Sequence, residues 1–537
     1  MAHAEGVFDY VIAGGGTAGC VLAGRLSANR SIKVLLLEAG PTDRHPLIHI
    51  PIGFAKLTAG PLEWGWSTVP QRNAGNRVIP LAQGKVIGGG GSINAQVFTR
   101  GTPRDYDDWA TVHGCRGWSF PEIQKYFIRS EDNERLSAPW HGTGGPIGVS
   151  DFIEPHVLSK AFVRAGQEFG LPYNGDFNGE HQHGVGLYQS TTRNGRRSSA
   201  ATGYLRPAMK RSNLTVKTGQ LVSRIVLDGK RAVAVDSIEG TTTTTYRARR
   251  EVIVAAGSIG SPKLLMLSGI GDPTELKGVG IQPRHDLEGV GRNLQDHCDL
   301  DVVYELRKYQ SLDRLALIRP RTLTAGLEYV FFRNGPLTST LVEGGAFSYA
   351  NKEEPTPDLQ FHFLPGAGVE AGIAAVRPGY GCTLNSYFLR PRSRGSVRLA
   401  SPDPAQAPLI DPNYLADDYD LEMSAEGLRQ SREIMTQPSI ARHIKKEHLA
   451  GGEPVRTKDD YLRFARNYGR TSYHPVGTCA MGVADASVVS PELRVHGLDG
   501  LRIVDASIMP AIVSSNTQAA TVMIAEKASD MILGKAG

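Results

Sequence analysis

FDYVIAGGGTAGCVLAGRLSANRSIKVLLLE, residues 8–38, has the pattern of a strand, a glycine turn, a helix and a second strand. The apolar run at 8–13 predicts the first strand, residues 17–27 predict the helix, and residues 33–37 predict the second strand. The chain therefore begins with a βαβ unit, which is typical of α/β folds built on a parallel sheet.

The glycines of this unit match a dinucleotide-binding fingerprint. Gly14 permits the tight turn, Gly16 lets a pyrophosphate approach the backbone, and Gly19 lets the helix pack on the strand. Glu38 ends the second strand, where a carboxylate can accept hydrogen bonds from ribose hydroxyls and repels a 2′-phosphate. Steric need alone also produces such glycines, but strand, helix and acid in register favour dinucleotide binding. A single fingerprint of this quality suits one tightly held FAD better than NAD.

Length and composition bound the remaining possibilities. A chain of 537 residues exceeds the size of one hydrophobic core, which predicts two domains or an elaborated domain pair. The 40% hydrophobic and 21% charged residues are typical of a soluble globular protein. The net charge of +5 comes without a long basic run, so we expect no nucleic-acid partner.

Cysteine usage and hydropathy bear on location. Five cysteines without a CxxC pair argue against a zinc site and a disulfide framework, and we expect no metal. The first residues lack a signal-peptide pattern, and no stretch holds 18 unbroken apolar residues. We expect a cytoplasmic protein and leave open peripheral contact with the inner face of the membrane.

Two further glycine-rich stretches carry local predictions. GKVIGGGGSINAQVFTRG, residues 84–101, places four glycines at 88–91, which suits main chain pressed against a flat ring or a diphosphate; the alternative is a flexible surface loop. REVIVAAGSIGSPKLLMLSGIG, residues 250–271, predicts a buried strand at 252–256 and a helix that starts near Ser261-Pro262 and closes at Gly269.

These two stretches resemble the two signatures of the glucose-methanol-choline (GMC) oxidoreductases, FAD enzymes that oxidise alcohols. Other stretches with the same resemblance, in order along the chain, are RSSAATGYL (197–205), GVGRNLQDH (289–297), YHPVGTCAMG (473–482) and LRIVDASIMPAIVSSNTQAATVMIAEKASDMI (501–532). The match runs from about residue 8 to the C-terminus. PLIHIPIGFAKL, GDFNG and PLIDPNYL look most like the bacterial branch of choline and medium-chain alkanol dehydrogenases.

The resemblance implies an α/β (α+β) architecture with two domains. A Rossmann-like FAD domain would be built from discontinuous segments 1–155, 195–305 and 465–537. A substrate domain, with a mostly antiparallel sheet and flanking helices, would come from 156–194 and 306–464. Alternating patterns in DLQFHFLPG and GSVRLAS agree with antiparallel strands.

The resemblance also implies a set of FAD contacts, several of them through main chain. These contacts are Gly14, Gly16, Thr17, Ala18, Glu38, Gly88, Gly91, Asn94, Val222, Asp505, Ala506, Asn516, Thr517 and Gln518. Members with covalent FAD carry histidine where this chain has Ile93, so we expect non-covalent FAD. Ala480 replaces a residue that is usually basic, and Gly90 and Gly91 replace residues that are commonly Ser or Cys; the effect of these departures stays open.

His474, between an aromatic residue and a proline, is the predicted catalytic base. Alcohol oxidation needs the hydroxyl proton removed as hydride leaves the carbon, and a group with a pKa near neutrality serves best. The resemblance places His474 over the flavin with Asn516 beside it as the donor that orients the alkoxide. An isolated histidine is more often a structural residue, which is the interpretation given to His141, His285, His297 and His362. For two of them an alternative stays open, because His297 lies in the flavin-adjacent LQDH, where it would contact the cofactor, and His362 lies on a strand that can face the cavity.

The function implied is oxidation of a primary alcohol, aliphatic or aryl-alkyl, to the aldehyde, with electrons passed to a quinone or another acceptor. One alternative is an oxidase that uses O₂ and releases H₂O₂. Another is a non-redox member of the hydroxynitrile lyase or fatty acid photodecarboxylase type. Residues 363–380 lack the aromatic density of a quaternary ammonium cage, which favours a neutral alcohol over choline. The sequence leaves the oligomeric state open.

Overall fold

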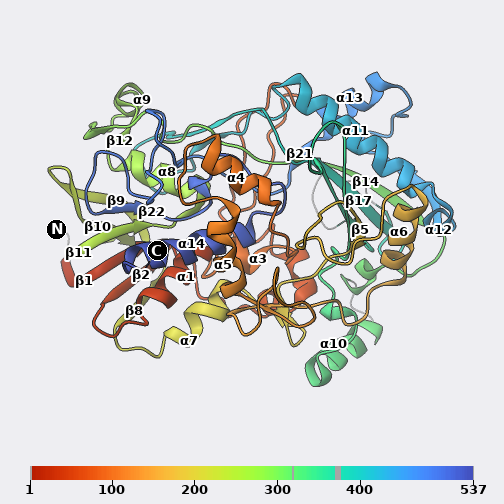
Figure 1. Cartoon of the computed structure of the whole chain (residues 1–537), viewed down its shortest axis with the longest axis horizontal. Coiled ribbons are helices and arrows are strands. Elements are labelled where there is room, and N and C mark those ends of the chain that lie inside the picture. The colour runs from red at the N-terminus through yellow and green to blue at the C-terminus, as the bar shows by residue number, and fades with distance from the viewer. Residues whose placement is uncertain (1–2, 317–319, 369–375, 536–537) are drawn as a thin grey trace.

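The computed structural model describes residues 3–316, 320–368 and 376–535. Figure 1 shows two sheet-centred halves side by side, with both chain ends on the half drawn at the left. The hydrophobic core is divided in the same way, because one large buried cluster surrounds the first sheet and a second surrounds the other sheet.

The first sheet contains the predicted βαβ unit. Its strands are β1 (His3–Ala13), β2 (Val34–Glu38), β8 (Leu214–Thr218), β9 (Leu221–Asp228), β10 (Arg231–Glu239), β11 (Thr242–Val254) and β22 (Leu501–Ile503), in the order β8-β2-β1-β11-β10-β9 with β22 also on β11. Strands β8, β2, β1, β11 and β22 are mutually parallel, and helix α1 (Thr17–Leu26) connects β1 to β2. Strand β2, which is buried along its whole length, has the apolar run VLLL before Glu38, as is typical of a strand inside a parallel sheet.

Strand β11 has two kinds of neighbour. Its first half pairs antiparallel with β10, which pairs antiparallel with β9, whereas residues 252–254 pair parallel with β22. Helix α8 (Gly257–Leu267) begins three residues after β11, so the predicted helix start near Ser261-Pro262 is wrong. Pro262 lies inside the helix because the hydroxyl of Thr478 donates to the carbonyl of Ser258, 2.6 Å away, in place of the N–H that proline lacks.

The second sheet is antiparallel throughout. It contains β5 (Gly184–Leu187), β14 (Cys298–Leu306), β15 (Gly344–Ser348), β16 (Leu359–Leu364), β17 (Gly381–Phe388), β20 (Ile444–His448) and β21 (Arg470–Thr471), in the order β20-β14-β17-β16-β15-β5 with β21 on β14. Helices α6 (Val157–Glu168) and α11 (Asp418–Met435) pack on it, and Figure 1 shows both at the outer side. Alternate residues of the sheet point the other way, toward the first half.

The remaining elements complete the two halves. The helices are α2 (Pro46–His49), α3 (Gly90–Ile93), α4 (Pro103–Thr111), α5 (Phe120–Ser130), α7 (Arg206–Ala208), α9 (Pro273–Gly278), α10 (Pro320–Phe332), α12 (Pro438–Ala441), α13 (Lys458–Tyr468) and α14 (Gln518–Ile532). Short 3₁₀ helices are η1 (Pro51–Lys56), η3 (Leu312–Ala316), η4 (Pro336–Thr338) and η5 (Ala506–Ile508), and η2 (Ala201–Leu205) is a short π-helix. Two-stranded ribbons are β3 (Glu131–Asn133) with β4 (Ile147–Val149), β6 (Thr192–Arg193) with β7 (Arg196–Arg197), β12 (Ile270–Gly271) with β13 (His285–Asp286), and β18 (Ser396–Arg398) with β19 (Leu409–Asp411).

Two strands of the second sheet come from segments that were expected in the FAD domain. Strand β14 pairs entirely within the second sheet, although the expected boundary after residue 305 assigns most of it to the FAD domain. Strand β21 also joins the second sheet from within the expected piece 465–537.

Across the described ranges, no helix combines the length and the apolar content needed to cross a membrane.

Candidate active site

A cavity of about 330 Å³ lies where the two halves meet. The glycine turn after β1 lines it from one side, and His362 and Asn385 line it from the second sheet. The predicted site residues that line this cavity are Gly14, Gly16, Thr17, Ala18, Glu38, Asn94, Val222, His474, Asp505, Ala506, Asn516, Thr517 and Gln518. Gly88 and Gly91 do not line it, whereas their neighbours Gly89 and Gly90 do.

The fingerprint glycines are needed for steric reasons at the turn. Gly14 has a φ of +111°, and a Cβ there would collide with the carbonyl of Ala255. A Cβ at Gly19 would collide with the carbonyl of Gly14, so this glycine lets helix α1 pack closely on the strand. Gly16 is the N-cap residue of α1 and has no side chain that could accept hydrogen bonds from the first helical turn. The N–H groups of that turn are therefore open toward the cavity.

Glu38 holds the turn from the end of β2. Its Oε2 accepts a hydrogen bond from the N–H of Gly15 at 2.8 Å, and its Oε1 accepts from the N–H of Gly40 at 2.7 Å. Burial raises the pKa of the Glu38 carboxyl, and these main-chain donors act in the opposite direction. Each oxygen keeps a further lone pair, so the predicted contact with a ribose hydroxyl remains compatible with the geometry.

The residues present fit a bound FAD. The N-termini of α1, α8 and α14 all open on the cavity, and the dipoles of these helices favour an anionic diphosphate or an anionic ring there. The loop at 88–91 is packed against the first glycine turn, since a Cβ at Gly89 would lie 2.8 Å from the Cα of Gly16. The alternative of a flexible surface loop is therefore wrong for this stretch.

Gly91 has a local explanation in Gln518. A Cβ at Gly91 would lie 2.7 Å from Nε2 of Gln518 and 3.0 Å from Oγ1 of Thr17. Those two side chains are hydrogen bonded to each other at 3.0 Å, Gln518 donating. The glycine thus gives room for a polar contact between α1 and α14. Nothing lies within 4 Å of a Cβ at Gly90, and no steric reason explains a glycine there.

His474 and Asn516, which are 42 positions apart in the sequence, meet in the cavity. Nε2 of His474 lies 3.0 Å from Nδ2 of Asn516. The preceding residue, Tyr473, has a left-handed φ of +63°, and the N–H of His474 donates to Oδ1 of Asp296 at 2.8 Å. Together with the ring of Pro475, these restraints hold the imidazole at one angle.

A chain of hydrogen bonds fixes the tautomer of His474. Nε2 of His297 lies 3.1 Å from the carbonyl oxygen of Leu389, which only accepts, so this nitrogen carries the proton. Nδ1 of the neutral His297 is then an acceptor, and it lies 3.1 Å from Nδ1 of His474, which must donate. Nε2 of His474 is therefore left bare on the side of Asn516.

The amide of Asn516 is oriented by two donors. Its Oδ1 accepts hydrogen bonds from Oγ1 of Thr99 at 2.9 Å and from Nε2 of Gln360 at 3.0 Å. The Nδ2 group consequently faces His474, and an amide group has two N–H bonds to donate. One of them points at the bare imidazole nitrogen, and the other is available to an oxygen in the cavity.

Burial sets the protonation state of the histidines around this pair. It lowers the pKa of His474 well below the ordinary value, and the neighbouring His297 and His362 act in the same direction. Burial also lowers the pKa of His297 to about 4 and that of His362 to about 3. All three imidazoles are neutral at neutral pH, which is the form that a general base requires.

Sequence reasoning missed a polar wall that the second sheet contributes. Asp299 of β14 lines the cavity with Asn385 of β17, whose Nδ2 donates to Oδ2 of Asp299 at 2.9 Å. Oδ1 of Asp299 is buried and has no hydrogen-bond partner among the described residues. Burial, followed by the adjacent carboxylate of Asp301, raises the pKa of Asp299 well above the ordinary range. The alternation of acids in CDLD, which puts both on one face of a strand, was the available signal.

The other histidines separate into two groups. His362 lines the cavity, as its strand pattern allowed, and its Nε2 lies 3.0 Å from Nε2 of Gln360. His141 lies in a buried cluster with Glu131 and Asp176, and Nε2 of His285 donates to the carbonyl of His496. The structural interpretation of His141 and His285 therefore agrees with their surroundings. The same interpretation does not describe His297, which contacts His474, or His362, which lines the cavity.

Known proteins resemble this chain over nearly its whole length. Family models described as GMC oxidoreductase match residues 8–299 and 391–525. The chain is 42% identical to the alcohol dehydrogenase [acceptor] of Pseudomonas putida, over 98% of this chain and 96% of the relative. It is 40% identical to the oxygen-dependent choline dehydrogenase of Brucella anthropi over the same shares.

Solved structures share the whole fold. The pyridoxine 4-oxidase of Mesorbium loti superposes with a TM-score of 0.88 at 30% identity, covering 98% of this chain and 99% of that one. A formate oxidase of Aspergillus oryzae, studied for its FAD modification, superposes with a TM-score of 0.93 at 27% identity, covering 99% of each chain. The chain belongs to the GMC oxidoreductase family and is an FAD-dependent oxidoreductase.

Proposed function

We propose that this enzyme oxidises a neutral primary alcohol to the aldehyde, with His474 as general base and Asn516 as the donor to the alcohol oxygen. The observation that carries the proposal is the bare Nε2 of His474, 3.0 Å from Nδ2 of Asn516 at the wall of the cavity. A base and a donor that converge on one point suit a hydroxyl group, which must lose a proton while its oxygen gains charge.

The two side chains divide the work at the substrate oxygen. Nε2 of His474 accepts the hydroxyl proton, and an N–H of Asn516 stabilises the negative charge that develops on oxygen. FAD supplies the acceptor for the hydride that leaves the carbon. The protonated His474 keeps its Nδ1–H bond to His297, and its side chain is buried.

Support for a neutral alcohol comes from the polar wall. Burial raises the pKa of Asp299, which disfavours the ionised carboxylate that would select a cation at the cavity. Phe54, Val342 and Leu364 add apolar lining that suits an aliphatic or aryl-alkyl chain. The Pseudomonas putida relative is an alcohol dehydrogenase. The sequence argument against a quaternary ammonium cage falls partly on residues 369–375, which lie outside the described residues.

The electron acceptor is proposed to be a quinone or another acceptor besides oxygen. The relative at 42% identity is named for an unspecified acceptor, which supports this choice. The oxidase alternative is supported by the name of the pyridoxine 4-oxidase at 30% identity. Both use the same reductive chemistry at His474, so they differ only in how the reduced cofactor is reoxidised.

The experiment is an anaerobic panel of 1-alkanols, benzyl alcohol and choline, with loss of the yellow flavin absorbance as the readout. We expect the neutral alcohols to bleach the cofactor, and we expect bleaching to persist on admission of air without formation of peroxide. Reoxidation with stoichiometric peroxide would establish the oxidase alternative instead. Bleaching by choline alone would overturn the substrate class, and retained FAD that no alcohol bleaches would favour a non-redox member.

A further inference from the structure

Helix α10 turns apolar side chains to solvent. Among the described residues, its exposed large hydrophobic side chains are between 59% and 77% accessible, and they are Leu323, Leu327, Val330, Phe331 and Phe332. The residues from Leu323 to Phe331 in this set follow one another at intervals of four, three and one positions, so their side chains lie on one arc of the helix. Contiguous apolar surface of this kind marks a contact site on a soluble protein.

The opposite face fixes the helix to the body of the enzyme. Ala325 and Tyr329 are buried, and the hydroxyl of Tyr329 donates to the carbonyl of His49 at 3.3 Å. The guanidinium of Arg333 lies over the ring of Tyr329, 4.9 Å from its centroid. Because the helix is held on its inner face, the outward orientation of the apolar arc is part of the fold.

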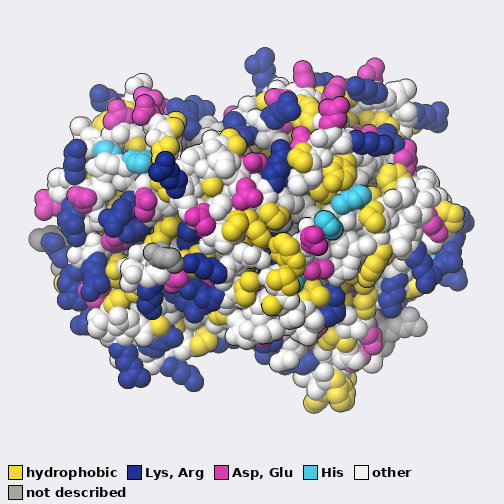
Figure 2. Space-filling view, viewed as in Figure 1, with side chains coloured by type: hydrophobic (Ala, Val, Ile, Leu, Met, Phe, Trp, Pro, Cys, Tyr) yellow, Lys and Arg dark blue, Asp and Glu magenta, His cyan; other side chains and the backbone are white. Residues whose placement is uncertain are grey.

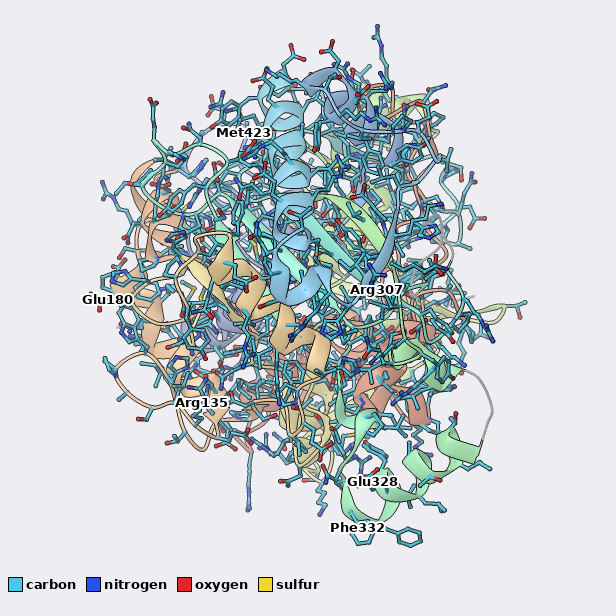
Figure 3. The ribbon with its side chains drawn as sticks, turned by 90° about the vertical axis from the view of Figure 1, so that its right-hand side faces the viewer. Arg135, Glu180, Arg307, Glu328, Phe332 and Met423 are labelled. Atoms are coloured by element: carbon cyan, nitrogen blue, oxygen red, sulfur yellow. The ribbon has the colours of Figure 1, made fainter. Side chains whose placement is uncertain are left out.

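The exposed arc lies on a convex projection. Figure 3 shows α10 standing out from the molecule, with Phe332 at its extremity and Glu328 nearer the body. Figure 2 shows hydrophobic side chains gathered on the same projection at the lower edge. A protruding apolar helix suits insertion into a soft surface, whereas a protein partner would need a matching groove.

Charge around the helix favours an anionic partner. Residues 312–333, from the start of η3 to the residue after the helix, contain four basic residues, Arg314, Arg319, Arg321 and Arg333, against two acidic ones, Asp313 and Glu328. Arg196 also lies near enough to Tyr329 to influence its titration. Basic residues beside exposed Leu and Phe are typical of helices that lie in the interface of an anionic membrane.

The helix adjoins elements that wall the cavity. It packs against η3 and η4, and η4 packs against η1, which contributes Phe54 to the lining. Leu312 of η3 belongs to the same buried cluster as Val342 and Leu364, which also line the cavity. A partner that bound the exposed arc of α10 would therefore lie close to the wall of the cavity.

We propose that α10 docks the enzyme on an anionic lipid bilayer, with Leu327, Phe331 and Phe332 entering the interface between headgroups and acyl chains. The proposal is independent of the substrate and of the acceptor, because it concerns a surface outside the catalytic machinery. Basic side chains near α10 contact the lipid headgroups, which makes the binding sensitive to salt.

The test is cosedimentation of the FAD-loaded full chain with vesicles of equal parts phosphatidylglycerol and phosphatidylethanolamine, and with pure phosphatidylcholine vesicles. We expect binding to the anionic vesicles that weakens at high salt, and a loss of roughly tenfold or more in F331S/F332S. The matched control is V112S/V483S, which removes two side chains that are 70% and 71% exposed on other elements. Both double variants should keep the alcohol-dependent bleaching of the wild type.

A second readout follows the tip of the helix directly. All five native cysteines are buried, so Phe332→Cys offers a selectively labelled thiol. An environment-sensitive dye there should shift its emission to the blue with anionic vesicles, and a dye at Val112→Cys should not.

Wild-type protein left in the supernatant, or F331S/F332S that binds as well as wild type, would overturn the proposal. A wild-type dimer that F331S/F332S converts to monomers, without vesicle binding, would assign the face to a second copy of the chain.

Discussion

At the scale of single residues, the tautomer of His474 is set by a main-chain oxygen that does not touch the cavity pair. The carbonyl of Leu389 accepts from His297, and His297 in turn accepts from Nδ1 of His474. His297 therefore acts through His474 as a positioning residue. A histidine in the sequence LQDH gave no indication of this role, because the partner lies 177 positions away.

Replacing His297 tests this relay. His297→Leu leaves the buried Nδ1–H of His474 without an acceptor, a loss of about 1–3 kcal/mol that should slow flavin reduction roughly tenfold to hundredfold. His297→Gln supplies a carbonyl oxygen and should recover part of the rate. The measurement is anaerobic stopped-flow reduction by a primary alcohol, and equal rates in wild type and His297→Leu would contradict the relay.

The pH dependence of the reductive step follows from the same site. The base must be unprotonated, and burial lowers the pKa of His474 below its ordinary value of about 6.5. The neutral base is thus fully present above that value, and activity should be lost only as the pH falls through the lowered pKa. Flavin reduction rates measured between acid and neutral pH should stay flat down to about 6.5. A half-maximal rate at or above that pH would show that the base is not held neutral by burial.

At the scale of elements, helix α8 depends on a hydroxyl from another segment. Thr478 donates to the Ser258 carbonyl that Pro262 cannot serve, and this contact lets the helix start before its proline. The rule that proline favours the first turn predicted a later start, since a single sequence cannot show a donor from 220 positions away. The same limitation applies to Gln360, whose contact with Asn516 depends on strand register in the second sheet.

Removal of that hydroxyl should cost stability. Thr478→Val leaves the buried carbonyl unsatisfied, and we expect the free energy of unfolding to fall by about 1–3 kcal/mol. Thr478→Ser retains the donor and serves as the control. Thermal unfolding of the FAD-loaded protein provides the measurement, and an unchanged melting temperature in Thr478→Val would show that α8 does not need this bond.

At the scale of the whole molecule, the cavity is assembled from segments that span nearly the entire chain. Local patterns were sufficient to predict the first βαβ unit, because its glycines and apolar runs all lie within about 30 residues of one another. The approach of His474 to Asn516 came instead from the resemblance to the family, and the structure places the two in contact. The boundary of the second domain could not be predicted to the residue, since β14 continues directly from the loop that carries His297.

The mode of cofactor binding is a property of this whole assembly. Ile93 is buried beside the cavity and offers no nucleophile, so we expect FAD to be held by non-covalent contacts alone. Heat or acid denaturation followed by filtration should release all the yellow absorbance as free FAD into the filtrate. Flavin that stays with the precipitated protein would contradict non-covalent binding and would point to another attachment residue.

The rate of anaerobic flavin reduction in His474→Ala measures the central claim most directly. Loss of the general base should slow reduction by a primary alcohol roughly 10²–10⁴-fold while FAD remains bound. His285→Ala, which removes a histidine outside the cavity lining, should reduce its flavin at the wild-type rate. A His474→Ala enzyme that bleaches as fast as wild type would contradict the assignment of the base.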